Sequence, residues 1–199
     1  MLDRADKQQL DMSDAEVYYW PYFFTTKQSN FYLQELLSTI SWRQDQIQLF
    51  GKQIWLPRLT AWYGDPGKTY KYSGIRNEPQ PWTPALLEIK RAVENAGKVA
   101  FNSVLLNYYR HGQDSMGWHA DDEPELGTNP VIASVSLGQE RRFDFRHRTD
   151  KLLPKSSVYL THGSLLIMQG PTQHFWQHQV PKINKPAAPR LNLTFRFIC

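Results

Sequence analysis

The sequence predicts an α+β domain in which helices come first and sheet-forming strands follow. Before residue 99, two segments repeat apolar residues with helical spacing, and the second begins with a helix start signal. After residue 99 the pattern changes to short runs rich in β-branched and aromatic residues, separated by turn residues. Six such runs without a helical pattern between them predict a sheet sandwich or roll, with the helices packed on one sheet.

The first helix is expected to begin after Ser29 or Asn30, either of which suits an N-cap, and to end near Trp42. Its apolar stripe is Tyr32, Leu33, Leu36, Leu37 and Ile40. Residues 1–28 are expected to be an N-terminal extension. Residues 29–199 are expected to form one domain, since a chain of 199 residues suits a single core.

The second helix has clearer boundaries. Thr83 is the expected N-cap, Pro84 suits the first helical position, and Gly97 suits the left-handed residue after the last turn. Between the helices, the stretch 49–74 mixes aromatic, glycine and basic residues without a regular period, which predicts irregular strands and turns that form a lid over a site.

The expected strands are Ser103–Tyr109, Val131–Leu137, Arg141–Arg146, Ser157–Thr161, Ser164–Gln169 and Leu191–Ile198. Gly138-Gln-Glu, between the second and the third of them, predicts a hairpin turn.

Composition narrows the classes of function. A net charge of +4 permits a polyanionic partner without requiring one. Cys199 is the sole cysteine, which excludes an intramolecular disulfide, a cysteine-rich zinc site and an iron–sulfur cluster. The first twenty residues lack the apolar core of a signal peptide, and no apolar run is long enough to span a membrane. We expect a soluble monomer, cytoplasmic in a bacterium or nuclear in a eukaryote, with no membrane partner.

The stretch Met116–Glu125 places one histidine among carboxylates. In an extended segment, alternation puts His119 and Asp121 on the same side. This H-x-D pair is either a solvated turn or part of a metal site. A ferrous oxygenase site needs two histidines and one carboxylate on one face. Four later histidines could complete it: His147, His162, His174 and His178.

The C-terminal strand divides its side chains by character. Leu191, Leu193, Phe195 and Phe197 alternate with Arg190, Asn192, Thr194 and Arg196. The apolar set suits a core. The polar set either faces solvent or binds a carboxylate, for which the planar guanidinium is the preferred partner.

These motifs together resemble the AlkB-like Fe(II)/2-oxoglutarate dioxygenases, over the chain from about residue 47 to the end. The matching patterns are Asn107-x-Tyr109, His119-x-Asp121, His178 before Val180-Pro181, and Arg190-x-Asn192-x-Thr194-Phe195-Arg196. The resemblance implies a double-stranded β-helix, or jelly roll, with Fe(II) on His119, Asp121 and His178. It also implies a bound 2-oxoglutarate, whose metal end Asn107 and Arg196 would steady. Arg190, Tyr109 and Asn192 would hold its distal carboxylate. His174, expected on the same side as His178, would lie behind the ligands or toward the substrate.

The lid, residues 47–82, resembles the subgroup that repairs alkylated bases, which implies a nucleotide-recognition lid. The implied substrate-binding residues are Phe50, Arg58, Tyr70, Tyr72, Asp122 and Glu123. Phe50 would fill the gap left by a flipped base, and Tyr72 would stack on that base. Asp122 and Glu123 would favour a cationic methylated base, and the alternative for Glu123 is an exposed turn residue.

The resemblance implies oxidative demethylation of 1-methyladenine and 3-methylcytosine in single- or double-stranded DNA, with succinate and formaldehyde as products. Two alternatives stay open. One is a dioxygenase of the same fold that acts on RNA, a protein or a small molecule. The other is a non-catalytic nucleic-acid binder with a vestigial metal site.

Overall fold

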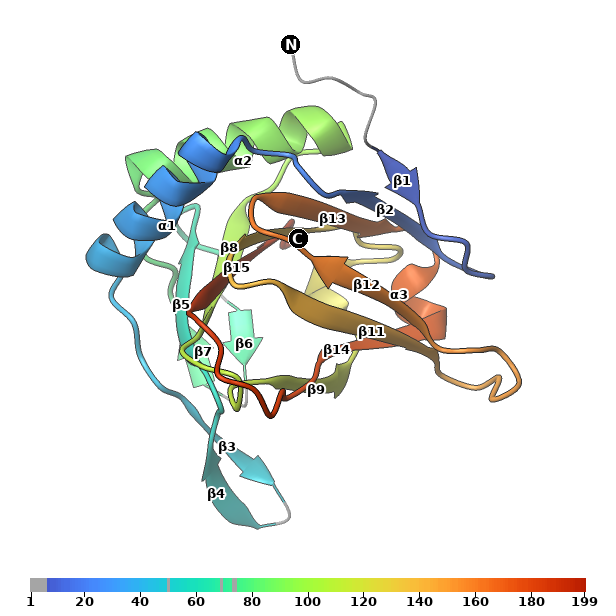
Figure 1. Cartoon of the computed structure of the whole chain (residues 1–199). Coiled ribbons are helices and arrows are strands. Elements are labelled where there is room, and N and C mark those ends of the chain that lie inside the picture. Colours follow the sequence, from blue (N-terminus) through green and yellow to red (C-terminus); the bar gives the residue numbers. More distant parts are fainter. Residues whose placement is uncertain (1–6, 50, 69, 73–74) are drawn as a thin grey trace.

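Two antiparallel sheets form the frame of the protein, as in a jelly roll (Figure 1). The computed structural model describes residues 7–49, 51–68, 70–72 and 75–199. In spatial order, the larger sheet consists of β1 (Gln8–Gln9), β2 (Glu16–Trp20), β13 (Ser164–Gln169), β10 (Ile132–Gly138), β15 (Arg190–Arg196), β8 (Ser103–Tyr109) and β5 (Leu59–Gly64). The smaller sheet consists of β12 (Ser156–Leu160), β11 (Arg141–His147), β14 (Trp176–Val180) and β9 (Met116–His119).

Two helices, α1 (Thr26–Thr39) and α2 (Pro84–Gly97), lie over the outer face of the larger sheet (Figure 1). Leu36 of α1 and Leu86 of α2 share one buried cluster with Leu106 and Leu193 of the sheet. Fully burying each leucine contributes roughly 1.5–3 kcal/mol. A second cluster lies between the sheets and includes Phe145 of the smaller one.

Helix α1 begins earlier than the sequence pattern predicted. Thr25 is the N-cap, and it forms a capping box with Gln28, whose side chain accepts from the Thr25 N–H at 3.1 Å. Ser29, one of the predicted caps, is instead fully buried inside the first turn. The helix ends at Thr39 rather than near Trp42, because the backbone of Ile40 is already extended. The T-x-x-Q signal explains the earlier start, since it satisfies N–H groups that the first turn leaves free.

Helix α2 follows its predicted boundaries closely. The Thr83 side chain accepts from the Leu86 N–H, and Pro84 occupies the first helical position. Lys98, rather than Gly97, takes the left-handed conformation after the last turn, with φ of 56°.

The predicted hairpin at Gly138-Gln-Glu is wrong. Strand β10 pairs with β13 and β15 in the larger sheet, whereas β11 pairs with β12 and β14 in the smaller one. The turn therefore carries the chain from one sheet to the other. Gly138 has φ of +90°, and a Cβ at this position would lie 2.3 Å from the Pro189 carbonyl oxygen. Only glycine allows this close approach to the start of β15. The turn motif by itself does not tell whether the next strand pairs back as a hairpin or crosses to the other sheet.

The segment before α1 contributes to the larger sheet. Strand β2 pairs with β13 over five residue pairs, and it buries Val17 and Tyr19 between the sheets. The predicted division at residue 28 would assign these core side chains to an extension.

The segment between the helices forms two hairpins and one strand of the larger sheet. The first hairpin, β3 (Gln46–Leu49) with β4 (Lys52–Trp55), projects from the body of the molecule (Figure 1). The second pairs β6 (Tyr70–Tyr72) with β7 (Ile75–Asn77). Two short helical segments, a 3-10 turn at Pro124–Leu126 and α3 (Thr172–Phe175), complete the described structure. Among the helices in the described ranges, none combines the length and the apolar character that crossing a membrane requires.

Candidate metal centre and cosubstrate pocket

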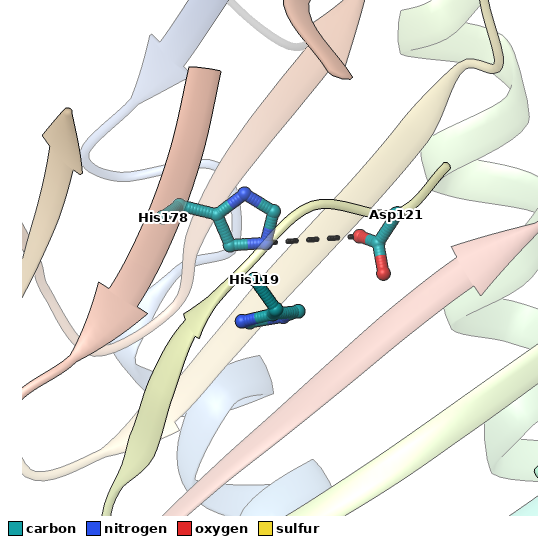
Figure 2. Close-up of side chains that lie close together, drawn as sticks. All are labelled: His119, Asp121 and His178. Carbon is teal, nitrogen blue, oxygen red and sulfur yellow. Dashed lines mark ion pairs between the residues drawn. The ribbon is translucent and has the colours of Figure 1, made fainter. Parts of the chain in front are cut away.

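Three potential metal ligands from two distant parts of the chain meet between the sheets (Figure 2). Each of His119, Asp121 and His178 offers one ligand atom, and these atoms lie within 4.8 Å of one another. Nε2 of His178 is 3.8 Å from Oδ2 of Asp121, and the two imidazole centroids are 4.3 Å apart. Asp121 and His178 are buried, while His119 is half-buried. The prediction that these side chains converge is confirmed.

Strand pairing explains why they meet. His119, the last residue of β9, lies directly opposite His178 of β14. Side chains of opposite residues in an antiparallel pair point to the same face of the sheet. Asp121 follows two residues later, so alternation returns its carboxylate to that face.

The protonation states of the triad suit a cation. His119 Nδ1 lies 2.8 Å from the Gly117 carbonyl oxygen, which can only accept, so Nδ1 donates in this bond and Nε2 is the ring nitrogen left for a metal. Burial lowers the pKa of His178 to about 3, so this imidazole is neutral at neutral pH. Burial raises the pKa of Asp121, but the charge of Arg196 and the two histidines outweigh it and lower that pKa to about 2. Two imidazoles and one carboxylate on one face fit a ferrous ion.

His174 takes no part in this cluster. It lies exposed on α3, and the helical turn 172–175 breaks the alternation that was expected to bring His174 and His178 to the same side. The prediction chose the right histidine for the triad, and the expectation that His174 lies toward the substrate stays a prediction.

A pocket opens beside the triad, and the polar face of β15 forms one of its walls. Apolar residues of that strand, such as Leu193, point to the helix side and are fully buried. The pocket is lined by Leu105, Asn107, Tyr109, Met116, His119, Asp121, Ser134, Phe143, Met168, His178, Val180, Arg190, Asn192, Thr194 and Arg196. All five residues predicted to bind the cosubstrate are therefore in the pocket with the triad.

Arg190 is a buried cation that needs an anion. Its side chain is almost fully buried, and its guanidinium carbon lies 5.0 Å from the centroid of the Tyr109 ring. Burial lowers its pKa to about 10, which leaves it charged at neutral pH. Nη2 donates to Ser136 Oγ at 2.9 Å, but the part of the chain that the structure describes offers no acceptor to Nε or Nη1. Since a buried unpaired charge is costly, these free donors fit a bound carboxylate.

Arg196, at the opposite end of β15, lies beside the potential metal ligand Asp121. Its Nη2 donates to Oδ1 of Asp121 at 2.5 Å. This ion pair explains part of the low pKa of Asp121. It also leaves Oδ2 as the carboxylate oxygen nearer to His178.

Arg58 supports the pocket from behind instead of facing a substrate. Its side chain is buried, and Nε donates to Oδ1 of Asn107 at 2.8 Å. Because that oxygen is occupied, the Asn107 amide nitrogen is directed to Asn192 Oδ1, 3.3 Å away. Asn192 in turn donates to Ser134 Oγ at 2.7 Å. The expectation that Arg58 contacts substrate does not agree with this burial.

The other predicted substrate residues have mixed outcomes. The Asp122 carboxylate accepts from Arg148 Nη1 at 2.6 Å, so a substrate would compete with an existing ion pair. Glu123 is half-buried, and within the described ranges its Oε2 has no hydrogen-bond partner. Phe50 lies outside the described residues. The backbones of Tyr70 and Tyr72 belong to β6, but their side chains also lie outside the described part of the structure.

The sequence pattern did not reveal some residues around the site. Phe143 stacks on the His178 ring with centroids 5.2 Å apart, and Ser136 bonds Arg190. Gln173 accepts a hydrogen bond from the backbone N–H of Asp121. Alternation along the predicted strands would have pointed to Phe143 and Ser136. No comparable signal marks Gln173, because it lies on a single helical turn.

Comparison with known proteins agrees with this geometry. The family model of the 2OG-Fe(II) oxygenase superfamily matches residues 16–196. The chain is 39% identical to alpha-ketoglutarate-dependent dioxygenase alkB homolog 3 of Mus musculus, over 100% of this chain and 72% of that protein. It is 45% identical to DNA oxidative demethylase ALKBH2 of Bos taurus, over 77% of this chain and 57% of that protein.

A solved structure described as the structure of OsALKBH1 shares the fold. Its TM-score is 0.67 at 18% identity, over 96% of this chain and 99% of that chain. A family match over nearly the whole chain and a converged His-Asp-His triad lead to the same conclusion: this chain belongs to the 2OG-Fe(II) oxygenase superfamily, among its AlkB-like dioxygenases, which depend on Fe(II) and 2-oxoglutarate.

Proposed function

We propose that this dioxygenase removes N-methyl groups from 1-methyladenine and 3-methylcytosine in DNA and releases formaldehyde while 2-oxoglutarate becomes succinate. The observation that carries the proposal is the 45% identity to a protein named a DNA oxidative demethylase. When bound, Fe(II) and 2-oxoglutarate use dioxygen to oxidise a carbon–hydrogen bond of the substrate. The side chains of the protein hold these groups and orient the substrate.

The two ends of β15 suit the two ends of 2-oxoglutarate. In this proposal Arg190 binds the distal carboxylate through its free Nε and Nη1, and Tyr109 and Asn192 line the same end. Arg196 and Asn107 lie toward the metal end, where Arg196 is already paired with Asp121. Arg58 keeps the Asn107 amide in one orientation.

The substrate is expected to enter beneath the two hairpins of residues 47–82, which act as the nucleotide-recognition lid. Phe50 would occupy the gap left by the flipped base, with Tyr70 and Tyr72 beside that base. Glu123 is half-buried as a residue, and its carboxylate has a buried oxygen, Oε2, with no partner in the described chain, which suits a cationic methylated base. Asp122 is the weaker candidate, because Arg148 already neutralises it.

A reconstitution experiment tests the proposal. The protein is incubated with Fe(II), ascorbate, 2-oxoglutarate and oligonucleotides that carry 1-methyladenine or 3-methylcytosine, as single and double strands of DNA and RNA. We expect equal amounts of succinate and formaldehyde with methylated DNA, and neither product with Asp121→Ala. Succinate without formaldehyde on every oligonucleotide would favour a protein or small-molecule substrate, and turnover confined to RNA would favour that alternative.

A substitution at Phe50 tests the lid. Phe50→Ala is expected to reduce demethylation of double-stranded DNA more than that of single strands, because only a duplex leaves a gap to fill. Trp55→Ala, which removes an exposed aromatic ring from the same hairpin, is the matched control. An equal loss on both substrates would remove the proposed role of Phe50.

A further inference from the structure

The metal ligand Asp121 lies beyond the end of its strand. On this side, the pairing of β9 with β14 ends at His119 and His178, so the ladder offers no partner to the backbone of Asp121. The residue is nevertheless buried, and a buried N–H requires an acceptor. Oε1 of Gln173 supplies it at 2.9 Å, across a separation of 52 positions in the chain.

The amide of Gln173 has only one suitable orientation. A backbone N–H can only donate, so Oε1 must face Asp121, and Nε2 then points to Met168 Sδ at 3.5 Å. The Gln173 side chain is fully buried, so no water replaces it readily. Removing this acceptor would leave a buried N–H group unsatisfied unless the backbone of Asp121 moved. Movement of that backbone would displace the ligand carboxylate.

Helix α3 holds Gln173 in place from two directions. Thr172 Oγ1 accepts from the Glu16 N–H at 2.9 Å and donates to the Gln169 carbonyl oxygen at 2.6 Å, which links α3 to β2 and β13. On the other side, Arg148 Nη1 donates to the Gln173 carbonyl at 3.1 Å and to the Asp122 carboxylate. The Asp121–Asp122 segment is thus fixed to α3 by one buried bond and one exposed ion pair.

We propose that Gln173 is a positioning residue for the metal: its hydrogen bond to the Asp121 backbone sets the ligand carboxylate in the triad, and Arg148 with Asp122 supports the same segment more weakly. Groups that orient a ligand in this way typically change metal affinity by 10- to 100-fold. The inference depends on the metal centre alone. It does not depend on which substrate is demethylated, so its test can fail while the proposed function stands.

Metal titration tests the inference without measuring turnover. Metal-free Gln173→Leu is titrated with Co(II), a redox-stable substitute for Fe(II), and its visible absorption band is followed. We expect the affinity to fall by roughly 10-fold or more. Gln169→Leu is the matched control, because this glutamine bonds Glu16 rather than a ligand segment. Its Co(II) affinity is expected to stay at the wild-type value.

Two outcomes would overturn the inference. One is a wild-type Co(II) affinity in Gln173→Leu, and the other is an equal loss in Gln173→Leu and Gln169→Leu. Thermal unfolding of the metal-free variants shows whether each one folds. If Gln173→Leu does not fold, the Co(II) affinity of Gln173→Asn is measured instead. Asparagine keeps the amide group, but its side chain is too short to place the amide oxygen at the Asp121 N–H, so the same loss of affinity is expected.

Discussion

The two sheets contribute different chemistry to one pocket. The smaller sheet carries the two histidines of the triad, on β9 and β14, and the segment after β9 supplies Asp121. The larger sheet carries the buried polar residues on β8 and β15, with Arg190 and Arg196 at opposite ends of β15. One wall thus offers imidazole nitrogens to a cation, and the facing wall offers guanidinium groups to an anion. We therefore expect substitutions on the smaller sheet to weaken metal binding, and substitutions of Arg190 on the larger sheet to weaken cosubstrate binding.

The Arg196–Asp121 ion pair connects the two walls. It places a positive charge beside the carboxylate ligand, which keeps that ligand ionised. Arg190 lacks such a partner among the described residues, and its free donors remain available to a ligand. The two arginines of one strand therefore have different roles, although the sequence pattern treats them alike.

The largest effect is expected at the smaller sheet. His119→Ala or Asp121→Ala should abolish turnover and Co(II) binding, because the remaining ligands no longer enclose one face of the ion. Turnover is followed as succinate formation, and metal binding is followed by titration. Full activity in either variant would refute the assignment of the triad.

Arg190→Ala is expected to weaken cosubstrate binding without weakening metal binding. Removing one partner of a buried charge pair costs about 2 kcal/mol or more, so the KM for 2-oxoglutarate should rise by roughly 30-fold or more. The Co(II) affinity without cosubstrate should stay at the wild-type value. Arg190→Lys keeps the charge but not the planar fork of donors, so its KM for 2-oxoglutarate should lie between those of the wild type and Arg190→Ala. A change in DNA affinity larger than the change in KM would show that Arg190 has another role.

Arg58→Leu is expected to have an intermediate effect. Losing a buried hydrogen bond from a charged donor should lower the free energy of unfolding by about 1.5–3 kcal/mol, as measured by urea denaturation. The KM for 2-oxoglutarate should rise less than in Arg190→Ala, with DNA affinity unchanged. Arg91→Leu, on the exposed side of α2, is the control. A selective loss of DNA affinity would instead restore the substrate role that the sequence predicted for Arg58.

The smallest effect is expected at the exposed pair of Arg148 and Asp122. Their side chains are 37% and 41% exposed, so Arg148→Gln should lower the free energy of unfolding by less than about 1 kcal/mol. Asp122→Asn should lower the free energy of unfolding by a similar amount if the pair has only a structural role. A much larger loss of affinity for methylated DNA in Asp122→Asn would indicate that this carboxylate also reads the base.

Local patterns predicted much of the fold because each had a local physical cause. The limits of β8 and β13 and the start of α2 follow from strand alternation and from the Thr83-Pro84 signal. The predicted start of α1 was wrong although its capping box is also local, because Ser29 and Asn30 also suit an N-cap and stand directly before the apolar stripe. The hairpin at Gly138 failed for another reason, since a turn motif does not specify which sheet receives the next strand.

The sequence by itself determined which side chains share a face: His119 with Asp121, and Arg190 with Asn192 and Arg196, since alternation is a property of an extended backbone. Only the tertiary structure decided which faces meet. Pairing of β9 with β14 brings His178 to His119, and the approach of the two sheets encloses Arg190 without a carboxylate from the described chain. Likewise, burial turned Arg58 from an expected surface contact into a support for Asn107. Contacts between distant segments depend on packing of the whole chain, which no local spacing encodes.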